Sequence, residues 1–278
     1  MTSFEFSGFV VGAAFIAGLL GSLTGLGGGV IVTPVLTLFL GVDMRYAIGA
    51  TLVSVIATSS GAAAAYVRDG LSNIRIGMFL EIATTIGAVV GAYLGTHVPT
   101  RMLMIVFGVV LLQAAWQSSR EHKHGDKTVA LDPLAERLKL NGDYNTEAGV
   151  VSYCVHRVKA GFALMFGAGT LSGLLGIGSG SLKVIAMDQA MRIPFKVSTA
   201  TSNFMIGVTA AASASVYLSR GYVNPGIAMP VMLGVLAGSL LGARFLPRAP
   251  VLVLRRVFAI VVGLMAIQMI FSGISGRL

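Results

Sequence analysis

Two short glycine clusters interrupt apolar stretches and are the first candidates for a binding site. One reads Gly25-Leu26-Gly27-Gly28-Gly29, and the other reads Gly176-Ile177-Gly178-Ser179-Gly180. A glycine costs about 1 kcal/mol relative to alanine inside a helix, so each cluster predicts a break between two helices. The helix that restarts after a break presents free N–H groups and the positive end of its dipole, which favour a bound anion. The alternative is close packing of helices through small residues.

Two charged side chains lie inside apolar runs. Lys183 follows the second glycine cluster, and Glu81 is the acidic residue of another run. Charges within a membrane segment are costly and usually face a cavity or a partner. We expect Lys183 to contact the anion, with pairing to Asp188 or to a carbonyl, or snorkelling to the surface, as alternatives. Glu81 is a candidate coupling carboxylate, or else a structural partner of Arg75 or of another buried donor.

Hydroxyl and amide side chains follow in the next apolar run of each half. They can hydrogen-bond an oxyanion, and the alternative is hydrogen bonding between helices. The predicted substrate-binding residues are Gly27, Gly28, Gly29, Thr33, Thr51, Gly178, Ser179, Gly180, Ser181, Lys183, Thr199, Thr201, Ser202 and Asn203.

The composition indicates a membrane protein. Of the 278 residues, 55% are hydrophobic and only 11% are charged, whereas soluble globular proteins carry roughly 25% charged residues. The net charge of +9 does not indicate a nucleic-acid-binding protein, because the basic residues flank apolar runs as topology signals do. The spacing of the histidines and carboxylates resembles no catalytic or metal site, so we expect neither an enzyme nor a cofactor or metal.

The apolar runs form two copies of one unit. A shift of 151 residues, without gaps, superposes Gly18 on Gly169, Tyr66 on Tyr217, and Pro99 on Pro250. The same register also superposes the two glycine clusters. In each copy, three runs approach the ~20 residues that a spanning helix needs, and the two runs before them are separated only by glycines. The chain therefore divides into a first membrane repeat (1–117), a polar cytoplasmic loop (118–157) and a second membrane repeat (158–278).

The polar loop predicts a small β-hairpin, because alternating residues precede Asn141-Gly142 and Val150–Val155 follows it. Its many basic residues place it on the cytoplasmic side.

The remaining basic residues predict the orientation of the two copies. If the first two runs of each copy form a there-and-back hairpin, eight of these residues lie inside and four outside; a single crossing reverses the numbers. The inside group is Arg68, Arg75, Arg192, Lys196, Arg244, Arg248, Arg255 and Arg256, and the outside group is Arg45, Arg101, Arg220 and Arg277. The hairpin is therefore favoured, and it gives each copy an odd number of crossings. The predicted fold is an all-α polytopic membrane protein with two inverted repeats, each a Gly-broken helix hairpin followed by three transmembrane helices.

Several of these motifs resemble a known family. The Gly25–Gly29 cluster with Pro34, the segment Ala47–Thr51 and its counterpart Ser198–Ser202 are similar to the signature of the TauE/SafE sulfite exporter family, also called the TSUP permeases. The resemblance covers roughly residues 8–116 and 160–274. It implies transport of sulfur oxyanions such as sulfite, or of organosulfonates, often as export.

The second copy departs from the first in its glycine cluster. Ser179 replaces the middle glycine, and Lys183 stands where the first copy has Val32. Ser181 follows the cluster, and Ile185 replaces the equivalent of Pro34. These differences place selectivity in the second copy.

We therefore expect a secondary transporter that moves a small, sulfite-like anion across the cytoplasmic membrane. The alternatives are a passive anion channel and a cation-coupled carrier of another small organic anion. Besides the anion and the bilayer, candidate partners are a coupling ion, H⁺ or Na⁺, and a second copy of the chain in a homo-oligomer.

Overall fold

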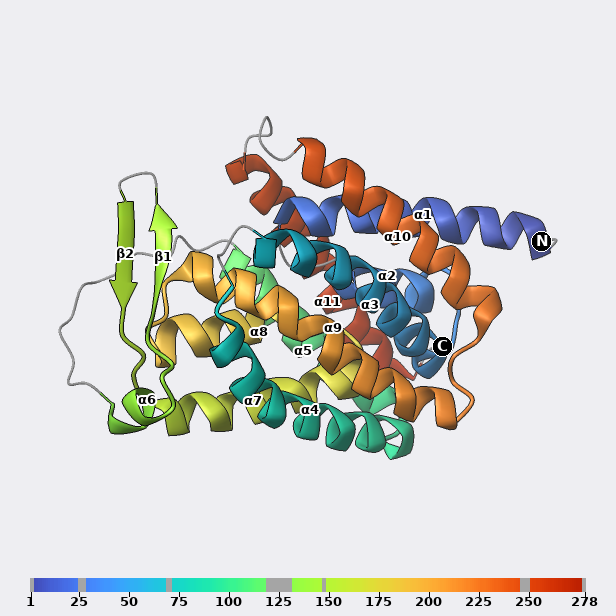
Figure 1. The fold of residues 1–278 in the computed structure, drawn as a ribbon. Coiled ribbons are helices and arrows are strands. Elements are labelled where there is room, and N and C mark those ends of the chain that lie inside the picture. The colour runs from blue at the N-terminus through green and yellow to red at the C-terminus, as the bar shows by residue number, and fades with distance from the viewer. Residues whose placement is uncertain are drawn as a thin grey trace.

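The computed structural model describes residues 3–24, 29–68, 72–118, 132–146, 149–245 and 251–276, and most of them are helical (Figure 1). The first half contains α1 (Ser3–Thr24), α2 (Gly29–Leu38), α3 (Met44–Arg68), α4 (Ile74–His97) and α5 (Thr100–Ser118). The middle contains α6 (Pro133–Arg137), β1 (Gly142–Thr146) and β2 (Gly149–Tyr153). The second half contains α7 (Val158–Leu175), α8 (Gly180–Ile185), the π-helical turn η1 (Ala186–Ala190), α9 (Phe195–Ser219), α10 (Pro225–Phe245) and α11 (Val251–Ser275).

Four helical segments within the described ranges are long and apolar enough to cross a membrane: Ile74–His97, Thr100–Gln117, Val158–Leu175 and Pro225–Gly242. On α4, Met78, Ile82 and Ile86 form an exposed apolar stripe, with 57% of Ile82 exposed. Residues four apart lie on one face of a helix, and such a stripe suits contact with acyl chains. The chain is a membrane protein, as its composition indicates. The face of α4 opposite the stripe is directed towards the protein interior.

Helix pairs pack along opposite edges of the molecule. α1 lies beside α10 along one edge and α4 beside α7 along the other, while α3 packs on α9 and α5 on α11 (Figure 1). Under the shift of 151 residues, α1 is equivalent to α7, and α4 is equivalent to α10. The pair α1–α10 is therefore equivalent to the pair α7–α4, with the first and second halves of the chain exchanged.

Glycines let these edge helices approach closely. A Cβ added to Gly18 on α1 would collide with the backbone of Val235 on α10. The equivalent Gly169 on α7 meets the backbone of Thr84 on α4 in the same way. Small residues at such crossings allow backbone-to-backbone packing in membrane proteins. Close packing therefore accounts for these repeated glycines.

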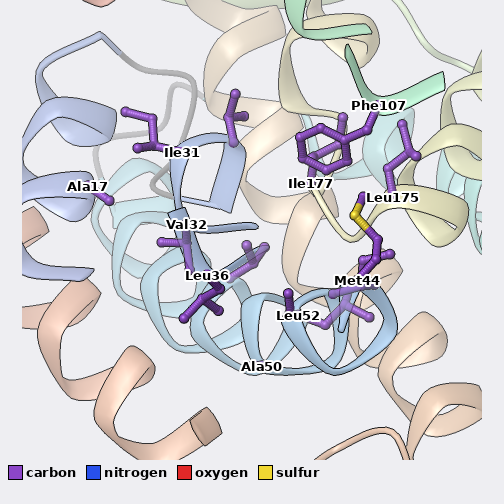
Figure 2. Close-up of a cluster of buried hydrophobic side chains, with 14 of the residues drawn as sticks. Ala17, Ile31, Val32, Leu36, Met44, Ala50, Leu52, Phe107, Leu175 and Ile177 are labelled. Carbon is purple, nitrogen blue, oxygen red and sulfur yellow. The ribbon is translucent and has the colours of Figure 1, made fainter. Parts of the chain in front are cut away.

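The larger hydrophobic core joins the two halves. Figure 2 shows Val32 and Leu36 of α2 and Leu52 of α3 in the same buried cluster as Leu175 and Ile177 of the second half. Helices α2 and α3 of the first half thus pack against the end of α7 in the second half.

The β-hairpin predicted for the middle segment is confirmed, but its predicted turn is misplaced. β1 and β2 are antiparallel, with Gly142 opposite Tyr153 and Thr146 opposite Gly149. Asn141-Gly142 therefore begins the first strand instead of forming the turn. The Asn141 side chain accepts the N–H of Val155 at 2.8 Å, and this contact holds the two ends of the hairpin together.

The middle segment is anchored to the helical part at two points. The Asn73 amide, which precedes α4, donates to the hydroxyl of Tyr153 at 2.7 Å. The Asp132 carboxylate accepts the N–H of Leu134 at 2.9 Å and that of Val158 at 2.8 Å. Asp132 therefore caps α6 and the start of α7 together. The hydrogen bond from Val158 is the largest cause of the lowered pKa of Asp132.

Candidate functional site

The second glycine cluster ends one helix and begins another, as predicted. α7 stops at Gly176, whose φ of 69° is left-handed and whose N–H donates to the Ser172 carbonyl at 2.8 Å. Gly178 and Ser179 are also left-handed, with φ of 70° and 44°. Glycine adopts this conformation at little cost, whereas a residue with a Cβ is strained by roughly 1–2 kcal/mol. α8 starts at the next residue, Gly180.

The start of α2 lies close to the break between α7 and α8. A Cβ added to Gly29, the first residue of α2, would lie 3.0 Å from the Thr51 methyl and 3.7 Å from the carbonyl oxygen of Gly176. Gly178 in turn lies against Val55 of α3 and Ile206 of α9. The start of α2, the break between α7 and α8, and helices α3 and α9 therefore share one region. Gly27 and Gly28 lie outside the described residues.

Equivalent hydroxyls tie each short helix to the long helix that follows it. Thr51 of α3 shares a hydrogen bond of 2.9 Å with Thr33 of α2, and both side chains are buried. Ser202, at the equivalent position on α9, donates to the Gly180 carbonyl of α8 at 3.2 Å. These four predicted residues thus lie at two related helix contacts.

Lys183 is fully enclosed by protein, with 0% of its surface exposed. Its ammonium donates to the hydroxyl of Thr209 on α9 and lies 3.9 Å from the carboxylate of Glu81 on α4. Thr209 donates to Glu81 Oε1 at 2.7 Å and so bridges the two charges. Lys183 is therefore paired with Glu81, which lies in the other half of the chain.

Glu81 is held by hydroxyl groups on both oxygens. Thr84 donates to Oε2 at 3.0 Å and Thr85 to Oε1 at 3.1 Å. With Thr209, three hydroxyls surround the carboxylate, and Glu81 is 8% exposed. In this structure Glu81 is therefore the partner of a buried donor, one of the alternatives expected from the sequence, and that donor is Lys183.

Ser179 is a buried hydroxyl without a hydrogen-bond partner in the described part of the protein. It is 2% exposed. An unsatisfied buried polar group costs about 1–3 kcal/mol. Its carbonyl accepts the Lys183 N–H at 3.0 Å, so Ser179 and Lys183 belong to the same helical turn. The left-handed strain and the hydroxyl without a partner in the described part thus fall on one residue, one helical turn before Lys183.

The other predicted residues on α9 lie nearer its start. Thr201 accepts the backbone N–H of Asn73 at 3.0 Å, which links α9 to the residue before α4. Asn203 donates to the Thr199 carbonyl at 3.0 Å, and the buried Thr199 hydroxyl has no partner among the described residues. The side chain of Ser181 lies outside the described part.

The sequence reasoning did not single out Thr209, Thr84, Thr85 or Asn73. Thr84 and Thr85 stand three and four residues after Glu81, and this helical spacing is a signal that a carboxylate has local donors. Thr209 carried no such signal, because its role depends on how α9 packs against α4. The described ranges contain no group of three or more His, Cys, Asp or Glu side chains that could hold a metal ion.

The sequence matches that of a known protein family over most of its length. The sequence profile described as "Sulfite exporter TauE/SafE" matches residues 10–269, which is nearly the whole chain. The chain belongs to the TauE/SafE sulfite exporter family. The resemblance drawn from the glycine cluster and the Ala47–Thr51 segment is confirmed.

Curated relatives of this TauE/SafE protein are named as membrane transporters. The probable membrane transporter protein YunE of Bacillus subtilis (strain 168) is 29% identical over 93% of this chain and 95% of its own length. A probable membrane transporter protein of Xylella fastidiosa (strain 9a5c) is 27% identical over 94% of both chains. The probable membrane transporter protein MJ0441 of Methanocaldococcus jannaschii is 25% identical over 92% of both. No solved structure matches the chain significantly.

Proposed function

We propose that this TauE/SafE protein is a secondary transporter that moves a small anion, a sulfur oxyanion or an organosulfonate of the sulfite type, across the cytoplasmic membrane. The observation that carries the proposal is the fully buried Lys183 at a helix break inside a membrane protein, one turn after Ser179, whose buried hydroxyl has no partner among the described residues.

Both groups are of the kind that binds an oxyanion. The ammonium supplies charge, and the hydroxyl is a donor that is not committed to another group of the described protein. Hydrogen bonds to charged groups contribute about 1.5–3 kcal/mol, enough to offset part of the anion's lost hydration. The clustered hydroxyl and amide residues Thr199, Thr201, Ser202 and Asn203 of the adjacent α9 supply further polar groups.

We also propose that the two membrane repeats, 1–117 and 158–278, have opposite orientations about the cytoplasmic segment 118–157. The exchanged pairing of α1–α10 and α4–α7 supports a twofold relation between the copies, and the distribution of basic residues favours opposite orientations. Inverted repeats with broken helices near the midplane are a recurring plan of secondary transporters.

The burial of Lys183 supports a carrier that works by alternating access. An ammonium with 0% exposure is not in contact with either aqueous side in this conformation. An anion therefore reaches it only after α8 moves relative to α4 or α9. A carrier has at least one such enclosed state, whereas a passive channel provides a continuous path when open.

Binding is tested first with the purified protein in detergent. Sulfite, sulfate, thiosulfate, methanesulfonate and acetate are titrated while the apparent melting temperature is measured, because a ligand of the folded state raises it. A rise with sulfur oxyanions that is absent in Lys183→Ala supports the site. Lys159→Ala, which alters an exposed lysine of α7, is the matched control. No shift with any of the anions contradicts the proposed substrate class.

Transport is tested in proteoliposomes. Uphill accumulation of the bound anion under an imposed H⁺ or Na⁺ gradient identifies a coupled carrier. Flux that only ever follows the anion's own gradient identifies a channel instead.

A further inference from the structure

The contact between Lys183 and Glu81 joins two helices that the chain does not connect locally. α4 supplies the carboxylate, α8 the ammonium, and α9 the hydroxyl of Thr209 between them. A fully buried ammonium is stable only when it is paired. In this state Glu81 therefore occupies the place of a counter-ion to Lys183.

The pair has no counterpart at the equivalent positions of the other copies of these helices. The shift of 151 residues carries Glu81 to Met232 and Lys183 to Val32, both apolar, and Thr209 to Thr58. The described part of the fold therefore contains this buried ion pair without a symmetry-related copy. A single pair predicts a single exchange of charge for each transported anion.

We propose that the transported anion displaces Glu81 from Lys183 and that Glu81 takes up a proton as it is displaced, so that one proton travels with each monovalent anion. This inference rests on the proposed transport function and adds the coupling ion and the residues that couple it.

Charge balance is the reason for the proton. Lys183 and Glu81 together are neutral, so an added monoanion would leave one uncompensated negative charge in the protein interior. Such a charge is costly at low dielectric constant, and a buried carboxylate responds by binding a proton. Protonation of Glu81 leaves a neutral acid beside a neutral pair of Lys183 and the anion.

The hydroxyls around Glu81 suit both of its protonation states. Thr84, Thr85 and Thr209 donate to the carboxylate in the present structure. A hydroxyl can also accept a hydrogen bond, so any of the three can receive the proton of the acid by rotating. Thr209 already accepts from Lys183 while it donates to Glu81, and it can keep contact with both residues through the exchange.

The packed helices carry other ionisable side chains at other positions in their sequences. They are Arg75, Tyr93 and His97 on α4, Lys159 on α7, Asp188 on η1, and Lys196 and Tyr217 on α9. Arg75 precedes Glu81 by six residues, about 9 Å along a helix. Asp188 follows Lys183 by five residues, across the π-helical turn. Glu81 is thus the carboxylate that lies 3.9 Å from the Lys183 ammonium and is also linked to it through the hydroxyl of Thr209.

The first test measures anion affinity against pH. Methanesulfonate is used as the probe, because it is a monoanion throughout the pH range in which the protein is folded. Where binding takes up a proton, wild-type affinity should fall by about tenfold per pH unit, the signature of one proton bound with each anion. Glu81→Gln, which resembles the protonated acid, should bind with an affinity that does not change with pH.

The second test measures coupling in proteoliposomes. An imposed proton gradient should drive accumulation by the wild type but not by Glu81→Gln, while Glu81→Gln should retain anion exchange. Glu81→Asp should restore the pH dependence, and Glu136→Gln, at an exposed site on α6, should behave as the wild type.

The outcomes separate the two proposals. If wild-type protein binds no anion, the transport function and this inference both fail. If the Glu81→Gln variant binds the anion with the same pH dependence as the wild type, only the inference is overturned. The same holds if a proton gradient still drives accumulation by Glu81→Gln.

Discussion

The ammonium of Lys183 lies 3.9 Å from the carboxylate of Glu81, with Thr209 hydrogen-bonded to both. The first residue belongs to the second half of the chain and the second to the first half. An ion pair between the halves, with its ammonium fully buried, links the packing of α4, α8 and α9 to the charge state of the interior. The stability of this membrane protein and its response to anions should therefore change together.

Removing one member of the pair should destabilise the protein more than removing both. Lys183→Met leaves Glu81 without its cation, and loss of one buried partner typically costs about 3–5 kcal/mol. The double variant Lys183→Met/Glu81→Gln leaves no buried charge at the pair and should recover much of that loss. Denaturation in detergent micelles measures the free energy of unfolding. A double variant that is less stable than both single variants would contradict this account.

Thr209→Val should lower stability by about 1–3 kcal/mol, because it removes a buried hydroxyl that bonds to Lys183 and Glu81 while the side-chain shape is retained. Thr209→Ser keeps the hydroxyl and should lose clearly less. The same unfolding measurement compares the two variants, and equal losses would show that the methyl group, not the hydroxyl, is responsible.

Ser179→Gly should stabilise the fold and weaken anion binding. Glycine removes the left-handed strain at φ 44°, a gain of up to about 1–2 kcal/mol, and it also removes the unpartnered buried hydroxyl. Ser179→Ala should lose the hydroxyl but keep the strain. Melting temperature and anion titration are measured on the same samples. Tighter binding by the glycine variant would rule out a role for this hydroxyl in the site.

Gly169→Ala should destabilise the α4–α7 pair, because its Cβ would collide with the backbone of Thr84. Overpacking of this kind typically costs about 1–3 kcal/mol. Gly167→Ala on the same helix is the matched control, since nothing lies within 4 Å of its added Cβ. It should be neutral or slightly stabilising, as alanine is the better helix former. Equal melting temperatures for the two variants would disprove the close approach.

Acid should loosen the attachment of the middle segment to α7. The Asp132 pKa is lowered from 3.8, mainly by the N–H of Val158, so the carboxylate contributes stability above its ordinary pKa. That contribution is lost as the pH falls through the lowered value. Asp132→Asn should therefore speed hydrogen exchange at the Val158 amide at neutral pH, and the difference from wild type should shrink in acid. Asp143→Asn, at an exposed position on β1, is the control.

Several features of this protein follow from local sequence alone. The deficit of charge indicates a membrane protein, because a chain facing acyl chains cannot carry the charged surface of a soluble one. The second glycine cluster predicted the break before α8, since backbone conformation is a local property and glycine adopts left-handed φ freely. The hairpin was predicted as an element, but its turn was misplaced, because Asn141 uses its side chain to hold Val155 instead of forming the turn.

Tertiary structure alone decided what the buried charges face. Sequence patterns identified Lys183 and Glu81 as costly charges inside apolar runs but could not pair them, because the pairing depends on how helices of different halves pack. The close approach of α4 to α7, made possible by Gly169, and the contact of α4 with α9 place Glu81 beside Thr209 and Lys183. Local propensity fixes where helices begin and end, whereas the neighbours of a side chain are chosen by packing across the whole fold.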